Sequence, residues 1–127
     1  MSKCQQTEFR AIAEAVARYY GVTVGDLTGL RRLSEVAYPR QILATLLRTA
    51  YGWSYSAIGR VLNRDHTTVM YSVRLITRER ATDPGLQADY DRLIQLSARA
   101  LIVAGAATTP VEARSAGLCI LNTHSEG

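Results

Sequence analysis

The chain has 127 residues, of which 47% are hydrophobic, and it carries a formal net charge of +4. This length and composition suit one small domain with a packed core plus an extension, and they exclude wholesale disorder. No apolar run approaches the roughly 18 residues that span a bilayer, the amino terminus lacks a signal-peptide layout, and the cysteines and histidines show no zinc spacing. We therefore expect a cytoplasmic protein without a membrane segment, a metal or another cofactor.

The first helix is predicted over residues 8–20, where apolar side chains recur at intervals of three and four. A short helical turn is predicted next, because Thr23 and Asp26 stand at the spacing of a capping box and Leu27 follows as an apolar side chain to bury. A longer helix is predicted from about residue 35 to residue 51. We place Pro39 in its first turn, where the missing amide donor costs nothing.

Two short helices are predicted next, over residues 55–62 and about 66–78, joined by three residues. Ser54 and Asp65 are expected as their N-caps, and Asn63 as a left-handed residue in the turn between them. Two helices in this arrangement form a helix-turn-helix candidate. The residues expected to pack the pair together are Ile58, Gly59, Leu62 and Val69.

A last helix is predicted to begin at Asp83 and Pro84 and to run to about residue 104. The apolar periodicity fails after Gly105, and we find no alternating pattern typical of strands. The sequence thus predicts an all-α fold, with one helical domain over residues 1–105 and a flexible tail over residues 106–127.

Positive charge concentrates around the predicted helix-turn-helix. Residues 30–80 hold nine arginines against three acidic residues, and the rest of the chain is slightly acidic. Charged stretches are often simply solvated faces, but a basic centre between neutral or acidic ends suits a polyanionic partner. Arginine also has the planar fork that binds phosphate and guanine in a bidentate manner.

The candidate site is the start of the second short helix, residues 64–68, because the first residues of a recognition helix meet base edges in DNA. Each side chain offers a short or fork-shaped group: the Arg64 guanidinium, the Asp65 carboxylate, the His66 ring, and the hydroxyl and methyl groups of Thr67 and Thr68. Asp65 also fits the role of a helix cap alone. A catalytic His66 would need a nucleophile and an orienting acid in a pocket, so we predict no enzyme.

Residues 8–97 resemble the C-terminal DNA-binding domain of the bacterial replication initiator DnaA. The matching pieces are VARYYGVTVGDL, RR followed by VAYPRQ, SAIGR, and the specific string RDHTTV. The resemblance implies a Trp-repressor-like helix-turn-helix fold that binds double-stranded DNA at DnaA-box-like sites, in control of replication initiation or transcription. It implies a nucleoid-associated location.

The resemblance also implies a role for individual residues. The major groove would receive Arg64, Asp65, His66, Thr67 and Thr68, and the adjacent minor groove would receive Arg32. The DNA backbone would be held by Arg31, Arg40, Arg48, Ser56 and Arg74.

The chain departs from the family pattern at several points. Tyr38 stands where arginine is common, and Asn63 replaces a pair of glycines. No GxxxxGK[ST] phosphate loop occurs, so we expect no nucleotide binding in the initiator's manner. The rival hypothesis is a protein–protein module that forms a homodimer or docks a partner through residues 86–127, with weak or non-specific DNA binding.

Overall fold

A computed structural model describes residues 3–29 and 34–105 of the chain. Every regular element in these ranges is helical and none is a strand, which confirms the predicted all-α class. The predicted tail, residues 106–127, and the pair Arg31 and Arg32 lie outside the described residues. The elements in chain order are α1 (Lys3–Tyr20), α2 (Val24–Thr28), α3 (Ser34–Thr45), the π-helical turn η1 (Leu46–Ala50), α4 (Tyr55–Leu62), α5 (His66–Thr82) and α6 (Pro84–Val103).

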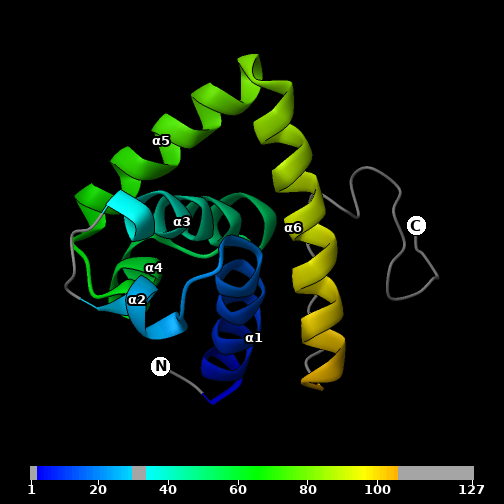
Figure 1. Ribbon diagram of the computed structural model, residues 1–127. Coiled ribbons are helices and arrows are strands. Elements are labelled where there is room, and N and C mark those ends of the chain that lie inside the picture. The colour runs from blue at the N-terminus through cyan, green and yellow to red at the C-terminus, as the bar shows by residue number, and fades with distance from the viewer. Residues whose placement is uncertain (1–2, 30–33, 106–127) are drawn as a thin grey trace.

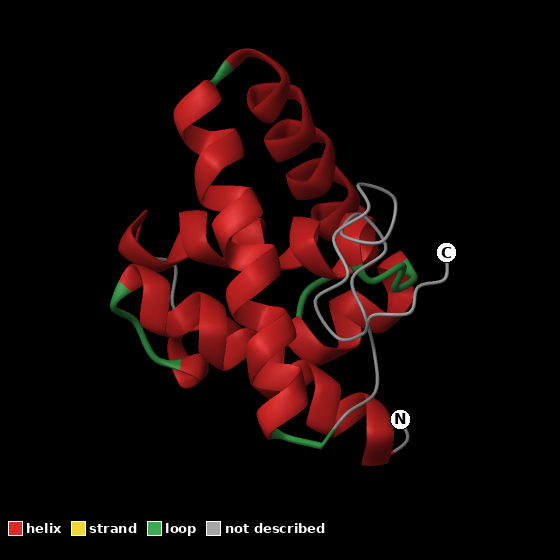
Figure 2. Cartoon of the chain, turned by 90° about the vertical axis from the view of Figure 1, so that its right-hand side faces the viewer, coloured by secondary structure: helices red, strands yellow, loops and turns green. Residues whose placement is uncertain are grey.

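Helix α3 and the turn η1 occupy the centre of the molecule (Figure 1). Helices α1 and α6 pack against each other on one side, α2 and α4 lie on the other, and α5 joins α6 at an apex that both views show (Figures 1 and 2). The apolar faces of these helices meet in one core, because each helix has a stripe of side chains that avoids water. Its largest fully buried apolar residues include Ile12, Leu27, Ile42, Leu43, Leu46, Leu47, Ile58, Leu62, Ile76, Leu93 and Leu101. In the described part of the chain, no helix is both long and apolar enough to cross a membrane.

The helix starts follow the cap chemistry that the sequence predicts. Thr23 and Asp26 form a reciprocal capping box at the start of α2, where Leu27 is buried. The Ser54 hydroxyl accepts a hydrogen bond from the amide of Ala57, three residues into the next helix. Asp83 caps α6 in the same way, and Pro84 takes the permitted first position. The predicted residues at these starts are therefore confirmed.

Several predicted boundaries are wrong. Helix α1 begins at Lys3 rather than residue 8, because no helix-breaking residue precedes Phe9. Helix α3 begins at Ser34, so Pro39 lies inside the helix and not in its first turn. Helix α5 continues past residue 78 to Thr82. It ends there because Asp83, the residue before Pro84, is extended and cannot continue the helix.

The predicted long helix after residue 35 is not α-helical over its whole length. Its last turn, Leu46–Ala50, is π-helical rather than α-helical. The hydroxyls of Thr45 and Thr49 donate to the carbonyls of the residues four positions earlier, 2.9 and 2.8 Å away, a type of contact that bends helices. Periodicity does not reveal such a turn, because the inward-facing residues remain apolar.

Candidate nucleic-acid interface

The turn between α4 and α5 is a Schellman motif. Asn63 takes the left-handed conformation with φ 58° and ψ 45°. The Asn63 amide donates to the Arg60 carbonyl at 3.4 Å, and the Arg64 amide donates to the Gly59 carbonyl at 2.8 Å. The left-handed residue predicted from the sequence is confirmed. This turn brings α5 back across α4, as a helix-turn-helix requires.

Asp65 is the N-cap of α5, as predicted. Its carboxylate accepts hydrogen bonds from the Thr67 amide, at 3.0 Å, and from the Thr67 hydroxyl. The Thr67 hydroxyl, followed by the Thr67 amide, holds the pKa of the Asp65 carboxyl below its usual value. The first turn of α5 is therefore held in place by its own side chains, which gives a fixed geometry to the residues around it.

The tip of α5 faces solvent. Asp65, His66, Thr67 and Thr68 are all exposed, whereas Val69 is buried against α4. The nearest nitrogen of the His66 ring, Nδ1, stands 4.0 Å from a carboxylate oxygen of Asp65. Four of the five predicted base-reading residues thus stand together on one accessible helix start.

Arg64 is the fifth, and its guanidinium group points to the protein's own backbone. It donates to the carbonyls of Leu62, Asn63 and Gly29 at 3.3, 3.0 and 2.8 Å. The Arg40 guanidinium, predicted to hold the DNA backbone, likewise donates to the carbonyls of Leu27 and Asp26. Burial, helped by the charge of Arg64, lowers the pKa of Arg40.

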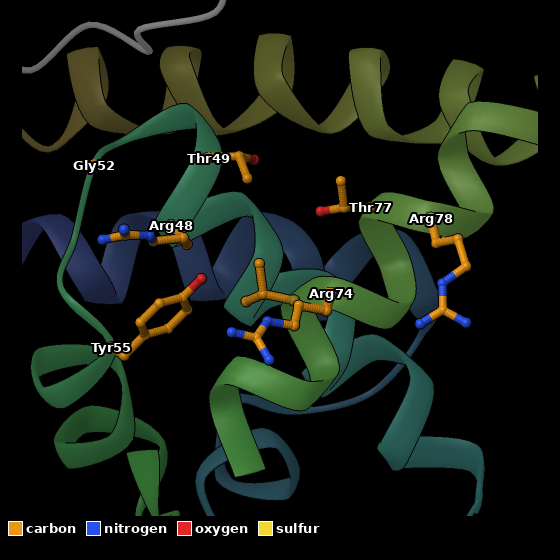
Figure 3. Close-up of a pocket in the computed structure, with 8 residues that line it drawn as sticks. Arg48, Thr49, Gly52, Tyr55, Arg74, Thr77 and Arg78 are labelled. Atoms are coloured by element: carbon orange, nitrogen blue, oxygen red, sulfur yellow. The ribbon is translucent and has the colours of Figure 1, made fainter. Parts of the chain in front are cut away.

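A basic depression of about 820 Å³ lies beside α5, between this helix, the turn η1 and the start of α4 (Figure 3). Among the residues that the structure describes, its lining includes three arginines and no acidic residue: Arg48, Thr49, Gly52, Tyr55, Val73, Arg74, Thr77 and Arg78. Three guanidinium groups gathered on one surface attract anions.

Arg48 makes two contacts within the protein at this depression. Its guanidinium lies 4.4 Å from the centre of the Tyr55 ring and donates to the Trp53 carbonyl at 3.1 Å. Figure 3 shows Arg48 above the Tyr55 ring and Arg74 to the right of it, with Arg78 one turn further along α5. The predicted backbone-binding residues Arg48 and Arg74 therefore share one surface, and Ser56 is exposed in the first turn of α4 nearby.

Sequence reasoning did not assign Arg78, Thr77 or Tyr55 to the site. The spacing of Arg74 and Arg78, four residues apart on one helix, is a signal that could have found Arg78. Tyr55 carries no such signal, because only the fold brings it under Arg48. In the described residues, no group of three or more histidine, cysteine, aspartate and glutamate side chains is placed to hold a metal ion.

Fold and site together define a helix-turn-helix protein with an exposed recognition-helix start. The family described as the bacterial dnaA protein helix-turn-helix matches residues 9–76, which is more than half of the chain. This protein belongs to that family.

Individual relatives agree with this assignment. The chain is 41% identical over 85 residues to the chromosomal replication initiator protein DnaA of Lactococcus lactis subsp. cremoris, which covers 66% of this chain and 19% of the relative. It is 38% identical over 86 residues to the protein of the same name from Neisseria meningitidis serogroup C, covering 67% and 17%. The chain thus spans about a fifth of the length of the curated relatives that it matches.

Proposed function

We propose that this protein binds double-stranded DNA sequence-specifically at DnaA-box-like sites and acts in the control of replication initiation or transcription. The observation that carries the proposal is the exposed tip of α5, with the family string RDHTTV, beside a depression with three arginines and no acid. Helix N-termini favour phosphate, and their first residues reach base edges when the helix enters the major groove.

Each exposed tip residue has a chemical role in this proposal. The His66 ring offers a donor or acceptor to a base edge, and Thr68 offers a hydroxyl together with a methyl group that packs on thymine. The hydroxyl of Thr67 is already donated to Asp65, which leaves its methyl group for an apolar base contact. Asp65 supports the tip as a cap and retains acceptor capacity for a cytosine amino group.

The basic depression would follow the DNA backbone. Arg74 and Arg78 are exposed, and Arg48 is held beside them by Tyr55 and the Trp53 carbonyl. Phosphate contacts of this kind fix the register of the protein on DNA without reading sequence. By the family resemblance, Arg32 reaches into the adjacent minor groove and Arg31 and Ser56 hold the backbone. These three contacts stay predictions.

Fluorescence-anisotropy titrations against a DnaA-box duplex and a scrambled duplex, at two salt concentrations, test the proposal. We expect at least about a hundredfold preference for the box, a threshold set below the roughly thousandfold or greater preference that is usual for specific DNA binding. His66→Ala and Thr68→Ala should each relax this preference by roughly 1–3 kcal/mol, while Arg74→Ala weakens both duplexes alike. Arg99→Ala on α6 removes an exposed charge far from the tip and is the matched control. Weak, equal and steeply salt-dependent binding of both duplexes would defeat the proposal.

A second candidate function, docking of a second copy or another protein through α6, is favoured by one observation. A depression of about 650 Å³ between α1 and α6 has apolar side chains in its lining, among them Leu96, Ala100 and Val103, and Val103 is 88% exposed. The lining also carries the charged side chains of Arg10, Glu14, Arg18 and Arg99. Sedimentation velocity over a range of protein concentrations tests the second copy, with Val103→Ser as the variant. A single monomeric species at every concentration excludes the homodimer.

A further inference from the structure

The guanidinium group of Arg64 bridges two parts of the chain that are far apart in sequence. One terminal nitrogen, Nη1, donates to the carbonyls of Leu62 and Asn63 in the helix-turn-helix turn, and the other, Nη2, donates to the carbonyl of Gly29 at 2.8 Å. Gly29 ends α2, 35 residues before Arg64. A planar fork with several fixed donors suits such a bridge, whereas a lysine ammonium offers a single point of attachment.

The bridge adds a hydrogen bond at the end of α2. The last carbonyls of a helix lack partners within the helix, and they attract positive charge. Here the Arg40 guanidinium donates hydrogen bonds to the carbonyls of Asp26 and Leu27, and the Arg64 guanidinium donates one to the carbonyl of Gly29. One arginine from α3 and one from the turn between α4 and α5 therefore hold the end of one five-residue helix.

The backbone of Arg64 is fixed as well. Its amide donates to the Gly59 carbonyl at 2.8 Å, and its own carbonyl oxygen packs closely against Gly59. Arg64 and Arg40 also line one small cavity of about 110 Å³ between α3 and α5, and none of the described residues that line it is acidic. Carbonyl dipoles, rather than a carboxylate, therefore stabilise the charge of Arg64.

We propose that Arg64 is a positioning residue, which ties the end of α2 to the turn of the helix-turn-helix and so orders the interface before DNA arrives, rather than a reader of a base. The inference rests on the proposed function and deepens it. Three hydrogen bonds to carbonyls already engage both terminal nitrogens of the guanidinium, so a fork aimed at guanine or phosphate through these nitrogens would compete with them. Hydrogen bonds from charged donors are among the stronger ones in proteins.

The tie is tested first without DNA. Arg64→Ala removes it, Arg64→Lys keeps the charge but not the bridge, and Arg60→Ala removes an exposed charge from α4 as the matched control. We expect Arg64→Ala to lower Tm by about 4 °C or more and Arg60→Ala to leave it unchanged. We expect faster hydrogen exchange at the Gly29 amide, which donates to Gly25, in both Arg64 variants. An unchanged Tm together with unchanged exchange would overturn the proposal, and the exchange measurement on Arg64→Lys decides the matter if Arg64→Ala does not fold.

Binding to a panel of duplexes, each with one base pair of the box changed, then separates positioning from reading. If Arg64 is a positioning residue, its substitution lowers the affinity for every duplex of the panel by a common factor, on the order of tenfold. The loss of affinity caused by each base change then stays the same as for the wild type. If Arg64 reads a base, the Arg64 variant no longer discriminates at one base pair and still discriminates at the others. That result would overturn the proposal. If the wild-type protein showed no preference for the box, the proposed function would fail. The Tm and hydrogen-exchange measurements would still test whether Arg64 connects the end of α2 to the turn.

Discussion

The carbonyl oxygen of Arg64 lies 2.6 Å from the point where a Cβ atom on Gly59 would stand. Real Cβ atoms do not approach an oxygen this closely, and the neighbour is backbone, so no rotamer change can relieve the contact. The hydrogen bond from the Arg64 amide to the Gly59 carbonyl holds the two residues at this separation. The absence of a side chain at position 59 therefore sets how closely the start of α5 approaches α4.

Gly59→Ala should destabilise the protein by about 1–3 kcal/mol, the usual cost of overpacking a close contact. This is the opposite of the normal helix preference, by which alanine stabilises a helix relative to glycine. Urea denaturation measures the effect. Gly25→Ala in α2 is the control, because its Cβ would meet only Thr23 Oγ1, at an ordinary 3.6 Å. Equal stability of the two variants would contradict the steric account.

Asn63 supplies the second requirement of the same turn, a left-handed backbone. Asn63→Val should lose about 1–2 kcal/mol of stability, because a branched side chain clashes in this conformation. Asn63→Gly should fold at least as well as the wild type, since glycine adopts this conformation without a steric cost. Comparison of the two urea midpoints checks the prediction. A similar loss for valine and glycine would mean that the Asn63 side chain, and not its backbone, matters.

The features predicted correctly from the sequence are those that depend on neighbours within a few residues. The caps Thr23, Ser54 and Asp65 and the left-handed Asn63 each act on amides or carbonyls at most four positions away. The helix-turn-helix follows from these local signals together with the apolar spacing around Ile58.

The features that the sequence could not show depend on contacts across the fold. Arg64 reaches a carbonyl 35 residues away, and Arg40 reaches carbonyls 13 and 14 residues away, so neither contact leaves a pattern in the chain. The sequence therefore showed no sign of these contacts, and it linked Arg64 to DNA by its place at the helix start and Arg40 by the family resemblance. The depression that gathers Arg48, Tyr55 and Arg78 likewise arises from the packing of three separate segments.

The Asp65 cap should make the stability of the free protein depend on pH in the acidic range. The pKa of Asp65 is lowered in the folded state, so its charge contributes stability above the ordinary value of 3.8, and this contribution is lost as the pH falls through the folded pKa. We expect the wild type to have a higher Tm than Asp65→Asn at about pH 7, with the gap closing toward about pH 3. Thermal unfolding at several pH values measures this gap. A gap that stays constant over the whole range would show that the charge of Asp65 is not the cause.

Arg48 should contribute to both stability and DNA binding, unlike its neighbour Arg74. The Arg48 guanidinium stacks on Tyr55 and donates to the Trp53 carbonyl, whereas Arg74 is exposed. Arg48→Ala should cost about 1–2 kcal/mol of stability, from the lost cation–π contact and hydrogen bond. Arg74→Ala should leave the urea midpoint unchanged. If both variants proved as stable as the wild type, the contacts of Arg48 would hold it in place without stabilising the fold.

The salt dependence of DNA binding should report which arginines of the basic depression meet phosphates. Each phosphate contact releases counterions, so losing one contact should reduce the slope of log K against log salt by about 0.9. We expect this reduction for Arg74→Ala and for Arg78→Ala, and none for Arg99→Ala on α6. The measurement is a set of binding constants at four or so salt concentrations, on the box duplex and on random DNA. Arg78 was identified only from the fold, because it lines the depression one turn beyond Arg74. A wild-type slope for Arg78→Ala would mean that the phosphate contacts made by α5 end at Arg74.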